Sequence, residues 1–346
     1  MQYLVLALIF INSLFETNSG LNDKSVKGLQ PNIGIDLKGT IRLAYGEDDK
    51  IYCMTSTDNG SSFSKPELVA RVGDMHLGNT RGPQIASSSN YSMITAIDKE
   101  GNIHSFKLDH SKNSWTKIKN VNDQKGSAPE GLMGLTADKN DHFYAVWLDV
   151  RIGKKNNIYF ASSDKSGSWN DNQLVYKSLE EHVCECCKPN ISFNNNRLVI
   201  TFRNWQMGSR DIYYSISANK GKSFTPAVKS GNGTWQLKGC PMDGGGSSIS
   251  DKGIVSAAWQ RSGDIFLAVQ NQPEQKIGSG RSVSMAQLKS NAVIAWQDKK
   301  NIKLYSIRSK KTIELGEGNF PRVYLLPNGK TICTWEDNKT ISYKVI

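Results

Sequence analysis

The sequence predicts an all-β protein, a single β-propeller built of four-stranded antiparallel blades. Two observations carry this prediction: a short strand phrase recurs along the chain, and no segment shows helical spacing of apolar residues over ten positions. In each repeat a Pro or Arg precedes a short apolar strand, a second strand usually ends in an aromatic residue, and a third strand begins with Ile. Repetition at a fixed period is typical of propellers and solenoids.

Seven copies of this phrase can be aligned. Their second strands are expected at residues 41–45, 92–97, 143–147, 198–202, 254–259, 292–296 and 331–335. Residues 31–346 divided over seven copies give about 45 residues each, the size of one four-stranded blade. We therefore favour seven blades, with six as the alternative. The last copy stops after its third strand, so we expect the segment around Ser25–Gly28 to supply the missing outer strand and close the ring.

The first 19 residues are expected to be a signal peptide. Residues 4–15 are apolar but too few to span a membrane comfortably, and the small residues Thr17 and Ser19 suit cleavage after Ser19. An uncleaved anchor or a buried strand is the alternative, because residues 1–3 carry no Lys or Arg. We expect residues 25–346 to form the propeller domain of a secreted or periplasmic protein.

The charge balance favours acidic partners. The chain holds 43 Lys and Arg against 32 Asp and Glu, a formal net charge of +11, which attracts anionic glycans and membrane surfaces. It has no run of basic residues, no helix-turn-helix pattern and no zinc-finger spacing, so we expect no nucleic-acid partner. After the N-terminal stretch no apolar run approaches the length of a membrane span. We expect a monomer.

Turns between third and fourth strands share the frame Ser-x-Asp-x-Gly-x-Ser-aromatic. Residues 56–63 match it fully, 217–224 carry Asn in the Asp position, and 162–169 carry Ser in the Gly position. In such a turn the Asp or Asn side chain caps its own backbone, Gly tolerates positive φ, and the aromatic ring packs into the blade. The residues to which we give this structural role are Ser56, Asp58, Gly60, Phe63, Asp164, Trp169, Asn219, Gly221 and Phe224.

This frame is the Asp-box, and the chain therefore resembles the sialidase (neuraminidase) superfamily of propellers, also called BNR-repeat proteins, from about residue 25 to the end. The resemblance implies an exo-sialidase-like hydrolase with three carboxylate-binding Arg, an Asp acid/base and a Tyr nucleophile activated by a Glu. Two defining positions differ: residues 29–33 lack the Arg of the first blade, and residues 187–191 lack the Glu of the fourth. Asp-boxes also occur on propellers that hydrolyse nothing, so catalysis is left open.

The beginnings of the first strands and the turns between second and third strands are expected to open on one face. Several Arg on that face suit an acidic sugar, because a guanidinium binds a carboxylate through two parallel hydrogen bonds. The alternative is that each Arg is solvated or pairs with a neighbouring acid. The expected substrate-binding residues are Arg81, Arg151, Arg203, Arg210, Arg261, Arg281 and Arg322. The acid/base candidates for hydrolysis are Glu130, Asp149 and Asp243.

Cysteines gather before the fourth and fifth blades. His182, Cys184, Cys186 and Cys187 precede one blade, and Cys240 and Met242 precede the next. Three interpretations stay open: a disulfide from Cys240 to one of the upstream cysteines, a soft-metal site for Cu or Zn, and redox-active or catalytic thiols. Because adjacent Cys186 and Cys187 cannot both point into one blade, at least one thiol is left for another role.

Two hypotheses for function follow from these patterns. The first is an exported sialidase-like propeller that recognises an anionic glycan such as a sialoside, with hydrolysis undecided. The second is a non-catalytic binding or docking module built around the metal or disulfide site. The two missing sialidase residues favour the second hypothesis, and the basic face favours the first.

Overall fold

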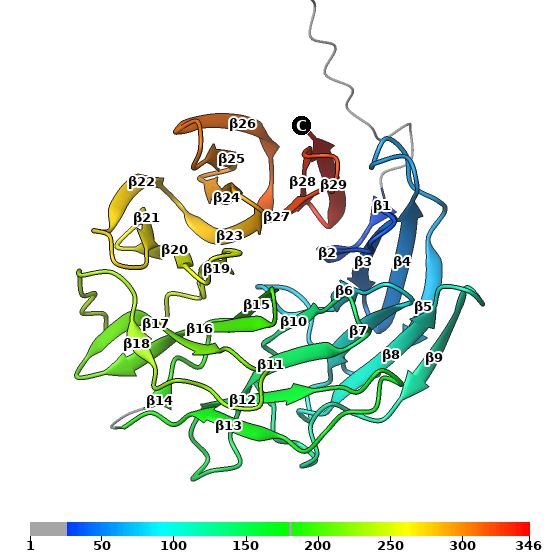
Figure 1. Cartoon of the computed structure of the whole chain (residues 1–346), viewed down its shortest axis with the longest axis horizontal. Helices are drawn as coiled ribbons and strands as arrows, with labels where there is room; N and C mark the ends of the chain where they lie inside the picture. The colour runs from blue at the N-terminus through cyan, green and yellow to red at the C-terminus, as the bar shows by residue number, and fades with distance from the viewer. Residues whose placement is uncertain (1–25, 180–181) are drawn as a thin grey trace, which may run out of the picture.

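The computed structural model describes residues 26–179 and 182–346, and these form a β-propeller of seven blades (Figure 1). The strands of each blade are antiparallel, and they follow the chain outward from the axis except in the last blade, whose outer strand is β1. The described residues contain no α-helix and so no helix able to cross a membrane. The prediction of an all-β fold with seven blades is confirmed. The expected signal peptide lies outside the described residues, and export stays a prediction of the sequence.

The blades occur in chain order around the ring. The innermost strands are β2 (Leu29–Ile35), β6 (Gln84–Ser87), β10 (Met133–Ala137), β15 (Asn190–Asn194), β19 (Gly246–Ile249), β23 (Arg281–Leu288) and β27 (Asn319–Leu325). The second strands are β3 (Ile41–Glu47), β7 (Tyr91–Ile97), β11 (Phe143–Asp149), β16 (Arg197–Gln206), β20 (Val255–Arg261), β24 (Asn291–Asp298) and β28 (Thr331–Asp337).

The third strands are β4 (Lys50–Ser56), β8 (Ile103–Asp109), β12 (Asn157–Ser162), β17 (Ser209–Ser217), β21 (Asp264–Val269), β25 (Asn301–Ser306) and β29 (Thr340–Val345). The outer strands are β5 (Glu67–Arg71), β9 (Ser114–Ile118), β13 (Gln173–Tyr176), β18 (Val228–Lys229), β22 (Gln275–Ser279), β26 (Lys311–Glu317) and β1 (Val26–Lys27). A further short strand, β14 (His182–Val183), pairs with the end of β16.

The ring closes where the two ends of the described chain meet. Strand β1 pairs antiparallel with β29, with Val26 opposite Ile341 and Lys27 opposite Thr340 (Figure 1). The Gly28 amide adds a hydrogen bond of 2.8 Å to the Lys339 carbonyl. The predicted closure of the last blade by the N-terminal segment is therefore confirmed.

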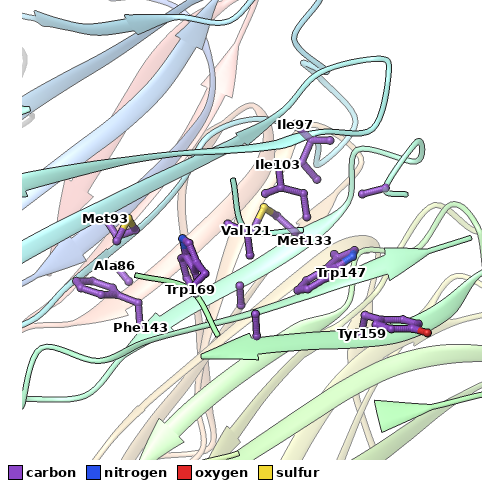
Figure 2. Close-up of a cluster of buried hydrophobic side chains, with 13 residues drawn as sticks. Ala86, Met93, Ile97, Ile103, Val121, Met133, Phe143, Trp147, Tyr159 and Trp169 are labelled. Carbon is purple, nitrogen blue, oxygen red and sulfur yellow. The ribbon is translucent and has the colours of Figure 1, made fainter. Parts of the chain in front are cut away.

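Apolar side chains fill the spaces between neighbouring blades. Figure 2 shows one such cluster, in which Met93 from the second blade lies near Phe143 and Trp169 from the third. Strand β11 is buried at every position, because sheets cover both of its faces. The core is thus a series of sheet-to-sheet interfaces arranged around the axis.

The turns with the Ser-x-Asp frame are held by their own side chains. In the first, Asp58 accepts hydrogen bonds from the Ser56 hydroxyl (2.7 Å) and the Ser62 amide (3.0 Å), and Gly60 has a φ of 83°. In the turn at 162–169 the positive φ falls on Gly167, one residue after the expected position. The aromatic residues pack on the preceding blade: Phe63 on Tyr343, Phe224 on Phe160, and Trp169 against Ser105.

A bulky side chain at Gly28 should weaken the closure. A Cβ atom there would lie 2.3 Å from Cδ2 of Tyr45, a ring that is buried in the blade. We expect Gly28→Val to lower the free energy of unfolding by about 1–3 kcal/mol. Gly73→Ala is the matched control, because its Cβ would meet no atom within 4 Å. Equal denaturant midpoints for the two variants would contradict the closure argument.

Candidate functional site

The seven innermost strands surround a central channel with a volume of about 490 Å³. Four strand beginnings share a Pro-x pattern, and the residue after each Pro lines this channel. These residues are Asn32, Gln84, Asn190 and Arg322. Because the inner strands converge at the axis, side chains from blades far apart in sequence meet here.

Two cationic side chains, those of Lys188 and Arg322, line one end of the channel, and we call this pair the septum. The Lys188 ammonium donates a hydrogen bond of 2.6 Å to the Gln84 side-chain carbonyl. The Arg322 Nη2 atom is buried and has no hydrogen-bond partner among the residues that the structure describes. Burial lowers the pKa of Lys188 well below its ordinary value, and the charge of Arg322 lowers it further. Burial also lowers the pKa of Arg322. Both side chains are therefore poorly compensated as cations.

The nearby carboxylates are engaged by amide groups. Asp243 accepts hydrogen bonds from the backbone amides of Gly245 (2.9 Å) and Ser282 (2.7 Å). Glu336 accepts them from the Gln30 amide (2.7 Å) and side chain (3.3 Å), and burial raises its pKa. Within the described ranges neither carboxylate hydrogen-bonds Lys188 or Arg322. The negative charges of Asp243 and Glu336 still act on Arg322 without a hydrogen bond: they favour its charged form and so offset part of the lowering of its pKa by burial.

A small cavity of about 10 Å³ lies on the other side of this septum. Its lining includes Lys188, Asp243, Gly244 and Arg322. A Cβ atom on Gly244 would lie 1.9 Å from the Lys188 carbonyl oxygen, so glycine is required for this close backbone approach. The volume corresponds to about one water molecule. The two cations therefore separate a large channel from a small cavity.

The cysteines before blades four and five lie together beside the septum. Cys186 and Cys240 form a disulfide, so the expected bridge from Cys240 to an upstream cysteine is confirmed. Cys184 and Cys187 are free and buried, with their sulfur atoms 3.2 Å apart. Met242 packs against this group. His182 is not brought to the thiols: its Nδ1 donates to the Val183 carbonyl, and its ring packs on Trp205.

The two free thiols differ electrostatically. A hydrogen bond with Cys187 and the charges of Arg210 and Arg203 lower the pKa of Cys184 to about 7. The Arg210 Nη1 atom lies 2.9 Å from the Cys184 sulfur. Burial raises the pKa of Cys187 well above its ordinary value. Of the two thiols, Cys184 is therefore the one that loses its proton more readily.

Blade four is extended to hold these residues. Strand β16 continues to Gln206, and β14 pairs with that extension, with Val183 opposite Asn204. The Cys184 amide then donates to the Arg203 carbonyl over 2.9 Å. The longer hairpin therefore fixes the loop that carries three of the four cysteines.

Arg203 is a structural residue rather than an exposed ligand-binding one. Its side chain is 1% exposed and donates to the backbone carbonyls of Asp243, Arg210 and Gln260 over 2.7–3.0 Å. The guanidinium also lies over the Trp235 ring at 5.3 Å. These bonds tie the blade-four hairpin to blade five.

The other expected substrate-binding arginines do not form one group. Four of them pair locally: Arg81 with Glu130, Arg151 with Asp123 and Asp149, Arg210 with Cys184 and Glu185, and Arg261 with Glu274. Arg281 is exposed, and Arg322 lines the channel. The structure therefore does not assemble the expected carboxylate-binding set, because most of its members are used in ion pairs within loops.

The acid/base candidates are engaged by neighbouring hydrogen-bond donors or cations. Asp149 is fully buried and accepts hydrogen bonds from Trp147 Nε1 (2.8 Å) and Arg151 Nε (2.9 Å). Glu130 lies beside Arg81, and Asp243 is capped by two amides as described above. The three residues do not share one cavity.

Lys188 is the site residue that the sequence interpretation missed. The resemblance places a Glu within residues 187–191, and the sequence interpretation assigns no role to the Lys found there. The available signal was its place in the Pro-x pattern, directly before Pro189 and Asn190.

Removing the Arg203 guanidinium should destabilise the fold. Arg203→Met leaves three backbone carbonyls without their donor, and each lost buried partner costs about 1–3 kcal/mol. We expect the free energy of unfolding to fall by at least about 3 kcal/mol. Arg281→Met, at an exposed position of the same face, should change it by less than about 0.5 kcal/mol. Similar stability of both variants would restore Arg203 as a ligand-binding candidate.

Comparison with known proteins agrees with this fold. No family model and no curated protein matches the sequence. Among solved structures, the chain is similar to an α-L-arabinanase from Penicillium chrysogenum complexed with arabinobiose (12% identity, TM-score 0.56, covering 93% of this chain and 94% of that one). It is also similar to a PL25 ulvan lyase (9%, 0.58, 92% and 94%) and to the intramolecular trans-sialidase of Ruminococcus gnavus (12%, 0.50, 96% and 96%). At such identities, what this chain shares with the sialidases, arabinanases and related proteins is their β-propeller fold.

Proposed function

We propose that the protein binds an anionic ligand, an acidic glycan such as a sialoside, at the septum formed by Lys188 and Arg322. The observation that carries this proposal is that two cations meet at the axis with no carboxylate hydrogen-bonded to either, among the residues described. Arg322 belongs to the substrate-binding set expected from the sequence, and Lys188 adds a second positive group.

A bound anion would offset the unfavourable free energy of burying Lys188 and Arg322 as cations. Burying a cation without a partner is unfavourable, and the lowered pKa of Lys188 expresses that cost. A carboxylate or sulfate at the septum would accept from the free Arg322 nitrogen and favour the charged form of Lys188. Affinity should therefore fall as the pH rises and Lys188 loses its proton.

The glycan class is supported by the fold and the overall charge. Similar propellers hold sugars: arabinobiose in the arabinanase, 2,7-anhydro-Neu5Ac prepared by soaking with 3′-sialyllactose in the leech trans-sialidase (TM-score 0.50), and Fucα1-6GlcNAc in a lectin of Aleuria aurantia (TM-score 0.52). The formal net charge of +11 adds long-range attraction for an acidic sugar over a neutral one.

The site favours binding over sialidase-type hydrolysis. The resemblance calls for a Glu that activates a Tyr nucleophile, whereas Lys188 stands at the fourth-blade position. Burial raises the pKa of Tyr324 to about 12, and its hydroxyl donates to the Asn32 amide oxygen rather than to a carboxylate. The acid/base candidates are held by other donors. These features support a binding protein.

Calorimetric titration with 3′-sialyllactose tests the proposal, with lactose as the neutral control ligand. We expect binding of the sialoside alone, and a loss of at least tenfold in affinity for Lys188→Met and for Arg322→Met. Replacement of a buried unpaired cation by Met should not unfold the protein, because it removes a desolvation cost. Arg308→Met, an exposed Arg in an outer turn, is the matched control. Equal affinities for all variants, or equal binding of lactose, would refute this site.

A second candidate function is binding of a soft metal ion, Cu or Zn, at the cysteines. The ligand atoms of Cys184, Cys186 and Cys187 all lie within 4.8 Å of one another, and Met242 adds a thioether beside them. Thiolate and thioether ligands favour Cu(I), and thiolates also favour Zn. The disulfide occupies Cys186, so the full set of ligands requires its reduction.

Elemental analysis of reduced protein prepared without chelators tests this candidate. We expect about one Cu or Zn per chain, lost in Cys184→Ser and retained in Cys333→Ser, which alters a buried cysteine in another blade. Metal-free protein, or equal metal in both variants, would exclude a resident metal at these thiols.

A further inference from the structure

Four sulfur atoms converge beside blade four in two different bonding states. Cys186 is bonded to Cys240, and the free sulfurs of Cys184 and Cys187 lie 3.7 and 3.9 Å from that of Cys186. The two free sulfurs are themselves 3.2 Å apart. A dithiol and a disulfide thus lie in direct contact, which is the arrangement that thiol–disulfide exchange requires.

The dithiol of Cys184 and Cys187 and the disulfide between Cys186 and Cys240 differ in their access to solvent. Cys184 and Cys187 are fully buried and Cys186 is 7% exposed. Cys240 is an exposed residue, in a segment where every second residue from Asn232 to Cys240 is exposed. One end of the disulfide therefore faces the buried dithiol, and the other belongs to the protein surface.

We propose that these cysteines form a thiol–disulfide exchange centre that reduces the disulfide of an external molecule. In it, Cys184 and Cys187 are the buried pair that supplies two electrons, and Cys240 is the exposed cysteine that reacts with the substrate. The activity is independent of the ligand site at Lys188 and Arg322.

The internal steps need no outside reagent. The Cys184 thiolate attacks the sulfur of Cys186, so that a Cys184–Cys186 bond forms, the Cys186–Cys240 bond breaks, and Cys240 leaves as a thiolate. Cys187 then loses its proton and attacks Cys184. A Cys184–Cys187 bond forms, and Cys186 is released as a thiol. The disulfide now joins Cys184 and Cys187, and Cys186 and Cys240 are reduced.

The external steps use the substrate disulfide as the oxidant. The Cys240 thiolate attacks it, forming a mixed disulfide and releasing one substrate thiol. Cys186 resolves the mixed disulfide, so that the Cys186–Cys240 bond forms again and the second substrate thiol leaves. In total the substrate gains two electrons and two protons, and the Cys184/Cys187 pair becomes a disulfide.

The surroundings favour Cys184 as the first nucleophile. The Arg210 guanidinium lies 2.9 Å from its sulfur and stabilises the thiolate, which is the reactive form. Glu185 lies 3.4 Å from the same guanidinium, so it offsets part of that charge. The other two free cysteines provide an internal comparison: Cys53 and Cys333 are buried within strands, and their thiols hydrogen-bond only to backbone carbonyls of the next residue.

Oxidised glutathione is the probe for this activity. We expect the folded chain, with its Cys186–Cys240 bond intact, to release two equivalents of glutathione thiol per chain and to end with a second disulfide joining Cys184 and Cys187. Peptide mapping by mass spectrometry after an acid quench and alkylation identifies the bonds. Cys240→Ser should slow glutathione release at least tenfold, and Cys333→Ser should leave it unchanged.

Cys240→Ser changes an exposed residue, so it tests the proposal even where variants of the buried pair do not fold. A Cys184–Cys187 bond that never forms across glutathione buffers from reducing to oxidising would overturn the proposal. Unchanged glutathione release by Cys240→Ser would also overturn it. So would thiols that react only after a chelator removes a metal ion, because the cysteines would then be metal ligands.

Discussion

The pairing of β1 with β29 is the constraint on which the rest of the structure depends. Each blade buries its apolar faces only against its two neighbours, so an open ring would expose the faces of the first and seventh blades. Closing the ring also fixes the innermost strands around one axis. The polar side chains at the beginnings of those strands then have to find partners among one another.

Some of these buried polar side chains have hydrogen-bond partners and others do not, and those without partners mark the candidate site. Arg203 is only 1% exposed, yet three backbone carbonyls accept its hydrogen bonds. Arg322 has a buried nitrogen without such a partner in the part of the chain described. Lys188 follows Cys187 directly, and Asp243 follows Met242, so the two loops that carry the thiol group also carry one of the two cations and one of the nearby carboxylates. Arg322, the other cation, belongs to β27.

The features that could be predicted from the sequence are those that local periodicity determines. The repeat favoured seven blades over six, the incomplete last repeat indicated the closure, and the turn frame indicated which side chains hydrogen-bond within each turn. The site was less predictable because its partners are distant: Gln84 lies 104 residues before Lys188, and Asp123 lies 28 residues before Arg151. The choice of Cys186 as the partner of Cys240 depends on how β14 and the extended β16 hold the loop, which the spacing of four cysteines does not determine.

The claim that the axis holds an anion is tested most directly by crystallography with bromide. Anomalous diffraction at the bromine edge locates the ion independently of any assumption about the sugar. The account predicts a peak between the Lys188 ammonium and the Arg322 guanidinium that disappears in Lys188→Met. An absent peak, together with a carboxylate of Asp243 or Glu336 bonded directly to both cations, would contradict it.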